Sequence, residues 1–278
     1  MFDAKEYYNR LQGYVRSIRE KTDMVPEAAI VLGSGLGDFA ENIDIECEVP
    51  YDSMEGFPVS TAPGHSGKFI FGTLNGVKVV CMKGRVHYYE GYEMRDVVLP
   101  LRVMHLLGAE TVIITNAVGC MNEDFSIGSF MVSTDCITSF VPSPLIGPNI
   151  EELGERFTDM SAVYDSELID KVMEIAEREN IEVHKGVFIQ LTGPQFETAA
   201  EIRMYKALGA DCCGMSSGVE AVAASHMNMK VCGISCITNY STGISKTRLS
   251  GEEVIETANR VSKDFEKLIK CLVEGFKK

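Results

Sequence analysis

Two features are missing from this sequence: a long apolar run and an excess of basic residues. No uninterrupted stretch approaches the ~18 apolar residues that a membrane span requires, and scattered charges between Met1 and Met24 leave no apolar core for a signal peptide. The chain carries 26 Lys and Arg against 40 Asp and Glu, a formal charge of −14. Nucleic acids and anionic membranes are bound through clustered basic side chains. We therefore expect neither as a partner, an amphipathic N-terminal helix, and a cytoplasmic protein.

Metal-ligand spacings are absent as well. The nine cysteines include no Cys-x-x-Cys pair, and no histidine is spaced for zinc. We interpret the cysteines as small buried hydrophobic residues and expect no metal. The sequence also lacks repeats and low-complexity linkers, and 45% of its residues are apolar. We expect a globular protein with a single domain over residues 1–278.

Strand-like and helix-like segments alternate along the chain, which predicts an α/β fold. Runs rich in Val, Ile, Phe and Thr predict strands at 28–32, 68–74, 77–82, 111–115, 129–138, 182–191 and 230–238, and a further short strand is expected to end at Met215. Asn75-Gly76 is typical of a tight β-hairpin, which makes the sheet mixed. A Pro- and Gly-rich loop at 141–154 is expected to cover a site.

Three helix starts carry a capping-box spacing, in which a hydroxyl and a Glu three residues later accept hydrogen bonds from each other's backbone N–H. The pairs are Thr198 with Glu201, Ser217 with Glu220, and Ser250 with Glu253. The first pair places Glu197, and the second Ser216, just before a helix, where free N–H groups attract anions. A last helix from about Glu252 has an apolar stripe that predicts core packing: Val254, Ala258, Val261, Phe265, Leu268 and Leu272.

A glycine-rich loop, Gly33-Ser34-Gly35-Leu36-Gly37, follows the first predicted strand. A nicotinamide-dinucleotide site needs Gly-x-Gly-x-x-Gly and an acidic residue about twenty positions later. Here the third glycine comes one residue early, and Asp38 takes its place. The loop therefore favours a smaller anion, bound by backbone N–H groups and a hydroxyl, over a nicotinamide cofactor. An ordinary strand-to-loop turn is the alternative.

Other candidate ligands lie in separate segments. Arg85 and His87 are two residues apart after a predicted strand, so in an extended chain both side chains point to one side. An arginine fork beside a histidine suits phosphate, and a surface Arg with a packed His is the alternative. His65 lies between glycines, either near a ligand or in a turn. Asn239, at the end of an apolar strand, suits the edge of a heterocyclic base or turns the chain.

Together these segments resemble those of the trimeric purine nucleoside phosphorylases, in the same order and spacing. The matching segments are 33–37, 64–65, 84–91, 115–117, 193–198, 214–216 and 237–239. The resemblance implies a mixed central β-sheet with a partly closed barrel, flanked by helices, and an active site near the interface of a homotrimer. It also implies reversible phosphorolysis of inosine, guanosine or their deoxy forms to a purine base and pentose 1-phosphate in purine salvage. Inorganic phosphate would be the co-substrate, without a cofactor.

The resemblance further implies roles for individual residues. Phosphate would be held by Ser34, His65, Arg85, His87, the Ala117 backbone and Ser216. The nucleoside would contact Tyr89, Phe157, Phe188, Phe196, Glu197, Met215 and Asn239, with Phe157 reaching into a neighbouring subunit's site. Glu197 would accept the N1 hydrogen and Asn239 would bond the N7 and O6 edge, and these two with His87 form the expected catalytic set. A carboxylate and an amide at these places favour 6-oxopurines over adenosine.

Two positions depart from the family pattern. Gly251 stands where a histidine usually meets the ribose 5′-hydroxyl, and Phe188 stands where a tyrosine usually binds ribose. We expect the lost hydrogen bonds to weaken sugar binding and to improve tolerance of 5′-modified nucleosides. The alternatives are a 5′-methylthioadenosine phosphorylase, which Asn239 disfavours, and a non-catalytic nucleoside-binding protein on the same scaffold.

Overall fold

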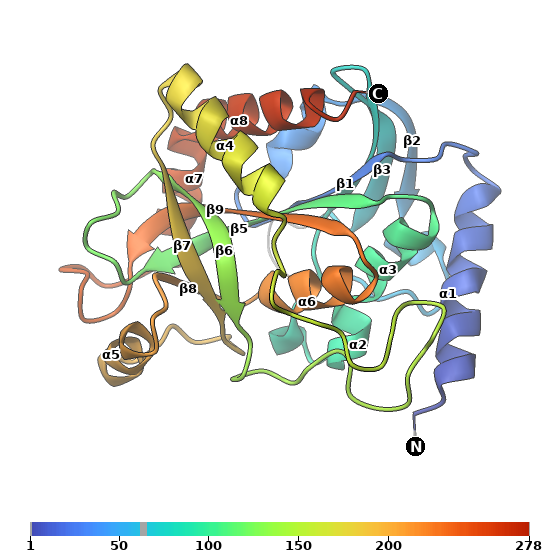
Figure 1. Cartoon of the computed structure of the whole chain (residues 1–278), viewed down its shortest axis with the longest axis horizontal. Coiled ribbons are helices and arrows are strands. Elements are labelled where there is room, and N and C mark those ends of the chain that lie inside the picture. Colours follow the sequence, from blue (N-terminus) through green and yellow to red (C-terminus); the bar gives the residue numbers. More distant parts are fainter. Residues whose placement is uncertain (1, 62–65, 278) are drawn as a thin grey trace.

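The computed structural model describes residues 2–61 and 66–277 (Figure 1). The strands are β1 (Ala28–Leu32), β2 (Asp44–Pro50), β3 (Lys68–Leu74), β4 (Val77–Lys83), β5 (Thr111–Cys120), β6 (Phe130–Ile137), β7 (Val183–Gln190), β8 (Cys212–Gly214) and β9 (Lys230–Tyr240). The helices are α1 (Ala4–Arg19), α2 (Met94–Val97), α3 (Leu99–Leu106), α4 (Ser166–Glu179), α5 (Ala199–Ala207), α6 (Gly218–His226), α7 (Gly251–Arg260) and α8 (Ser262–Glu274). Short 3-10 helices lie at η1 (Gly37–Asn42), η2 (Tyr51–Ser53) and η3 (Tyr88–Glu90).

One mixed sheet organises the described residues, with nine strands in the order β2-β3-β4-β1-β5-β8-β7-β6-β9. The last strand, β9, also pairs in parallel with β5 along its length, from Thr111 opposite Lys230 to Cys120 opposite Tyr240. This extra pairing joins β5, β8, β7, β6 and β9 into a closed barrel and leaves the remaining strands as an open extension. The predicted mixed sheet with a partly closed barrel is therefore confirmed.

The apolar runs lie where the sheet is covered on both faces. β1 is flanked by parallel β4 and β5, and all five of its residues are buried, as expected for a central parallel strand. The predicted N-terminal amphipathic helix is α1, which packs along α3 at the right edge of Figure 1. The helices α4 and α8 contact each other at the top of that view. Within the described residues, no helix has the length and apolarity to span a membrane.

Most predicted elements are found, with a few differences. The Asn75-Gly76 hairpin is confirmed, since both residues have positive φ, at 49° and 84°, and join antiparallel β3 and β4. The edge strand β2 was not expected, because only Val49 among its residues is fully buried. The last helix is divided at Val261 into α7 and α8. The core role predicted for its apolar stripe is confirmed at Ala258, Phe265, Leu268 and Leu272.

Candidate active site

A cavity of about 740 Å³ lies at the carboxyl ends of β1, β4, β5 and β9, beside the start of α6 and of α7. In an α/β sheet this is the edge at which ligands usually bind. Ten of the residues singled out from the sequence line this cavity: Ser34, Arg85, His87, Tyr89, Ala117, Phe196, Glu197, Met215, Ser216 and Asn239. The structure thus brings together side chains from segments that are far apart in the chain.

A buried ion pair fixes the arginine of the cavity. The Arg85 Nε lies 2.8 Å from Glu220 Oε2, and both side chains are only 1% exposed. Arg85 Nη1 donates to Ser216 Oγ at 3.1 Å and to the Thr115 carbonyl at 2.9 Å. Glu220 also accepts the Ser217 backbone N–H at 3.0 Å, at the start of α6. The guanidinium, the Ser216 hydroxyl and a helix N-terminus therefore meet at one point, a combination that suits an oxyanion.

The glycine-rich loop lies so close to two elements that neither Gly33 nor Gly35 has room for a side chain. A Cβ on Gly33 would lie 2.6 Å from the Asn116 Cα, and the Gly33 N–H donates to Thr115 Oγ1 at 3.2 Å. Gly35 has φ +74°, and a Cβ there would lie 2.8 Å from the Ala258 Cβ of α7. The loop is thus held between β5 and α7, which positions Ser34 at the cavity.

A carboxylate orients the cavity's histidine. His87 Nδ1 lies 3.0 Å from Glu90 Oε1, which also accepts the His87 backbone N–H at 2.7 Å. The His87 ring stacks on Tyr89 with centroids 4.7 Å apart and an interplanar angle of 15°. Burial raises the pKa of Glu90, but hydrogen bonds from His87 and Thr61 outweigh it and lower this pKa to about 2. An ionised Glu90 requires a proton on Nδ1, so the orientation and tautomer of His87 are both set.

The opposite part of the cavity holds a polar group that suits a base. Asn239 is 5% exposed; its Oδ1 accepts from Thr238 Oγ1 at 2.9 Å, and its Nδ2 donates to the Tyr240 carbonyl at 3.1 Å. Burial raises the pKa of Glu197, although hydrogen bonds from its own backbone and from the Cys213 thiol oppose this effect. A carboxylate whose pKa is raised by desolvation is typical of a functional site.

Two residues near Asn239, Cys213 and Ser241, were not among the site residues predicted from the sequence. The Cys213 Sγ lies 3.5 Å from Ser241 Oγ in a buried contact. A Cβ built on Gly119 would lie 2.9 Å from Ser241 Oγ and 3.5 Å from Cys213 Sγ. Both residues adjoin matched segments, Cys213 just before 214–216 and Ser241 two residues after Asn239, and that adjacency was the available signal.

Two predicted site residues lie elsewhere, and the position of a third is not described. His65 falls outside the described residues. Phe157 is 88% exposed on the loop after β6 and does not line this chain's own cavity. Phe188 is also absent from the lining; it is 1% exposed in a core cluster, and its ring lies 3.3 Å from the Cβ position of Gly214. In this structure the ring of Phe188 therefore supports the cavity wall from behind Gly214, because its side chain packs in a core cluster with residues of the other barrel strands.

The start of α7 provides an open, partly apolar end of the cavity. Gly251, Val254 and Ile255 line it, together with Ser250 and Glu252. A Cβ built on Gly251 would meet no atom within 4 Å. Within the described residues, no group of three or more His, Cys, Asp or Glu side chains could hold a metal ion.

Comparison with known proteins gives consistent matches. Residues 27–274 match the model of the Phosphorylase superfamily. The chain is 42% identical over 268 residues to purine nucleoside phosphorylase 1 of Bacillus subtilis (strain 168), covering 96% of this chain and 99% of that protein. A solved Schistosoma mansoni purine nucleoside phosphorylase in complex with inosine is 35% identical, covers 97% of both chains and gives a TM-score of 0.92. Another, in complex with adenosine, is 36% identical with a TM-score of 0.92, over 97% of this chain and 98% of that chain.

Proposed function

Because the chain belongs to the Phosphorylase superfamily, and within it to the purine nucleoside phosphorylases, we propose that its cavity performs the reversible phosphorolysis of inosine and guanosine. The protein is a pentosyltransferase that uses inorganic phosphate as co-substrate and needs no cofactor. The observation that supports these substrates most is the single cavity in which the Arg85–Ser216 anion site and the Glu197–Asn239 pair lie together.

Phosphate would be held at the start of α6. Five of the proposed phosphate ligands line the cavity: Ser34, Arg85, His87, Ala117 and Ser216. The buried Glu220 compensates the charge of Arg85 and fixes its plane, so binding does not have to order a flexible side chain. A positioned phosphate then attacks C1′ as the bond to N9 breaks, through a sugar cation like that of glycoside hydrolysis.

The purine would leave as an anion stabilised by Asn239. An amide that donates to N7 strengthens its hydrogen bond as negative charge develops on the base, and one such oriented donor contributes about 3–4 kcal/mol. Phe196 would pack on the base, while Tyr89 and Met215 would line the ribose; all three border the cavity. The Glu197 carboxylate would accept the N1 hydrogen of a 6-oxopurine.

Adenosine tests the base preference, because it carries no hydrogen on N1 and has an amino group at C6. A related phosphorylase has been solved with adenosine, so binding alone does not distinguish the bases. We propose that this chain discriminates in turnover, through an ionised Glu197. We also propose that the open end at Gly251 tolerates 5′-modified nucleosides.

The experiment is release of purine base with and without phosphate. We expect hypoxanthine from inosine only when phosphate is present, and at least tenfold lower kcat/KM for adenosine. An Arg85→Met variant should raise the KM for phosphate strongly. Equal turnover of adenosine and inosine would overturn the base preference, and nucleoside binding without turnover would indicate the non-catalytic alternative.

We further propose a homotrimer in the cytoplasm. Phe157 is 88% exposed and lies outside its own cavity, which supports a role in covering a neighbouring subunit's site. The free thiols, most of them buried, support a reducing compartment.

A further inference from the structure

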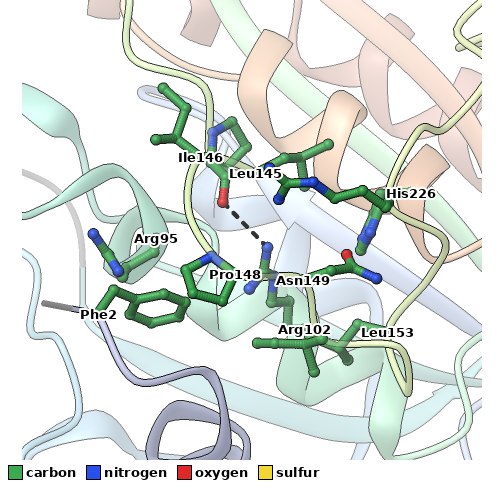
Figure 2. A pocket seen from close by; sticks show the side chains of 12 residues that line it. Phe2, Arg95, Arg102, Leu145, Ile146, Pro148, Asn149, Leu153 and His226 are labelled. Carbon is green, nitrogen blue, oxygen red and sulfur yellow. Dashed lines mark hydrogen bonds between the residues drawn. The ribbon is translucent and has the colours of Figure 1, made fainter.

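A second pocket lies beneath the loop that follows β6 and shares no lining residue with the active-site cavity. Its volume is about 20 Å³, somewhat more than the ~10–15 Å³ that a cavity needs to hold one water molecule. Figure 2 shows the Arg102 guanidinium in the middle of the pocket, with Arg95 and Phe2 on one side and His226 on the other. None of the twelve residues that line it is acidic.

Arg102 is a buried cation without a carboxylate partner in the described part of the chain. The residue lies in α3 and is 4% exposed. Its Nη2 donates a long hydrogen bond, 3.4 Å, to the Pro144 carbonyl, and the guanidinium also interacts with the Tyr7 side chain, 5.4 Å from the centroid of its ring. Its Nε has no hydrogen-bond partner. An arginine cannot lose its proton in a protein, and a buried charge normally has a counter-charge.

His226 presents a second unpartnered polar atom to the same pocket. It is the last residue of α6, 5% exposed, and its Nδ1 has no hydrogen-bond partner. The ring bonds the Glu155 main chain, while burial and the nearby charge of Arg102 lower the pKa of His226. No carboxylate contributes to that shift, which agrees with the absence of acidic lining residues.

The other two arginines of the pocket already have partners. Arg95 Nε lies 2.8 Å from Glu93 Oε2, and its guanidinium covers the Phe2 ring at 4.0 Å. Arg156 is exposed to solvent and donates to the Gly147 carbonyl. The uncompensated charge therefore belongs to Arg102, and water in the pocket would satisfy its Nε–H without neutralising the guanidinium.

We propose that this pocket binds a small monovalent anion of about the size of chloride. The anion accepts a hydrogen bond from Arg102 Nε–H, and Nδ1 of His226 donates a second one only in the ring that is protonated on both nitrogens, because the other nitrogen donates to the Glu155 main chain. The pocket shares no lining residue with the active-site cavity, so this site is distinct from the site of the reactant.

The anion would strengthen the link between the loop and the helices α3 and α6, which the loop already contacts through the Arg102–Pro144 and His226–Glu155 interactions. It sits between α3, the end of α6 and the loop segment that contains Asn149 and Arg156. The same loop is tightened by a hydrogen bond of 3.0 Å from Asn149 Nδ2 to the Gly154 carbonyl, and it carries Phe157. Anion binding should therefore stabilise the segment that presents Phe157, without contacting the nucleoside.

Bromide, with its anomalous X-ray signal, provides a direct test. We expect crystals grown in bromide to show an anomalous peak within hydrogen-bond distance of Arg102 Nε. The melting temperature should rise with chloride or bromide, compared with gluconate at equal ionic strength, and reach a plateau. Arg102→Met should abolish this halide-specific rise, whereas Arg95→Met, a matched loss of an arginine from the same pocket, should keep it.

Three results would overturn the proposal: no bromide peak at Arg102, a neighbouring subunit's carboxylate in its place, or an unchanged halide response in Arg102→Met. If that variant fails to fold, the bromide map of the unaltered protein decides alone. These readouts do not depend on turnover, so failure of the proposed substrates would leave this test intact.

Discussion

At the scale of single residues, two carboxylates fix the side chains that would bind phosphate. Glu220 holds Arg85, and Glu90 holds His87. The sequence identified Arg85 and His87 as candidates, but it marked Glu220 only as a capping residue. Arg85 and Glu220 are 135 positions apart, and a contact between such distant positions depends on how the strands are ordered. Local patterns therefore predicted the ligands but not the groups that orient them.

Replacing Glu90 with Gln should impair phosphate use. The variant keeps the shape of the side chain but loses the charge that sets the tautomer of His87, and a charge-assisted hydrogen bond contributes about 1.5–3 kcal/mol. We expect kcat/KM for phosphate to fall about tenfold or more, measured by steady-state kinetics at saturating inosine. Glu93→Gln, which removes an exposed carboxylate nearby, is the control and should leave this value unchanged. Equal effects of both variants would contradict a positioning role for Glu90.

The pH dependence of base selection should follow Glu197. Burial raises the pKa of this carboxyl above its ordinary value, so the ionised form that accepts N1–H is present at neutral pH and is lost as the pH falls through the raised pKa. The protonated form can instead donate to the unprotonated N1 of adenosine. We expect the ratio of kcat/KM for inosine to that for adenosine to fall as the pH is lowered through the raised pKa of Glu197. Glu197→Gln should make the ratio nearly independent of pH, and an unchanged slope in that variant would assign the effect to another group.

At the scale of elements, segments with a strong local sequence pattern formed the predicted structure, whereas a strand with a weak pattern was not predicted. The Asn75-Gly76 turn and the Thr198–Glu201 capping box are formed as predicted. The strand β2 was not predicted because it lies at the edge of the sheet and its acidic residues face solvent, which leaves little apolar pattern in its sequence. α7 packs against β9 and α8 against β3, and helical periodicity carries no information on the break between them.

The glycine-rich loop should not tolerate a side chain at Gly35. Alanine there would have to adopt φ +74° and place its Cβ 2.8 Å from the Ala258 Cβ. We expect Gly35→Ala to destabilise the protein by about 1–3 kcal/mol and to raise the KM for phosphate, because the loop must move away from α7. Gly251→Ala adds the same atoms where no neighbour lies within 4 Å. Both variants would be compared by thermal unfolding and by phosphate kinetics. Equal values for the two would contradict a role of the close fit of the loop in stability and in phosphate binding.

At the scale of the whole molecule, the mixed sheet was predictable but the strand order was not. The barrel closes through the β5–β9 pairing, which joins segments more than a hundred residues apart. No local signal specifies such a pairing, and only resemblance to a family implied it. The closure of the barrel also explains the position of the Phe188 side chain, which extends from β7 into the interior of the barrel and does not reach the cavity surface.

A shared active site should allow two defective subunits to complement each other. Phe157→Ala leaves its own cavity intact but removes the exposed ring, whereas Arg85→Met damages the cavity and keeps the ring. We expect each variant alone to show reduced kcat/KM, and co-expressed subunits to exceed the average of the two. Sedimentation should show the same trimer for all samples. Activity equal to that average, or full activity at dilutions that yield monomers, would contradict the shared site.

The central claim is that phosphate bound beside Arg85 is a reactant and not a structural ion. The most direct test is ³¹P NMR of the purified protein with inosine and inorganic phosphate. The account predicts one new phosphate monoester signal, that of ribose 1-phosphate, growing in equal amount with hypoxanthine and strongly slowed in Arg85→Met. Hypoxanthine appearing with free ribose, while the inorganic phosphate signal stays constant, would contradict it.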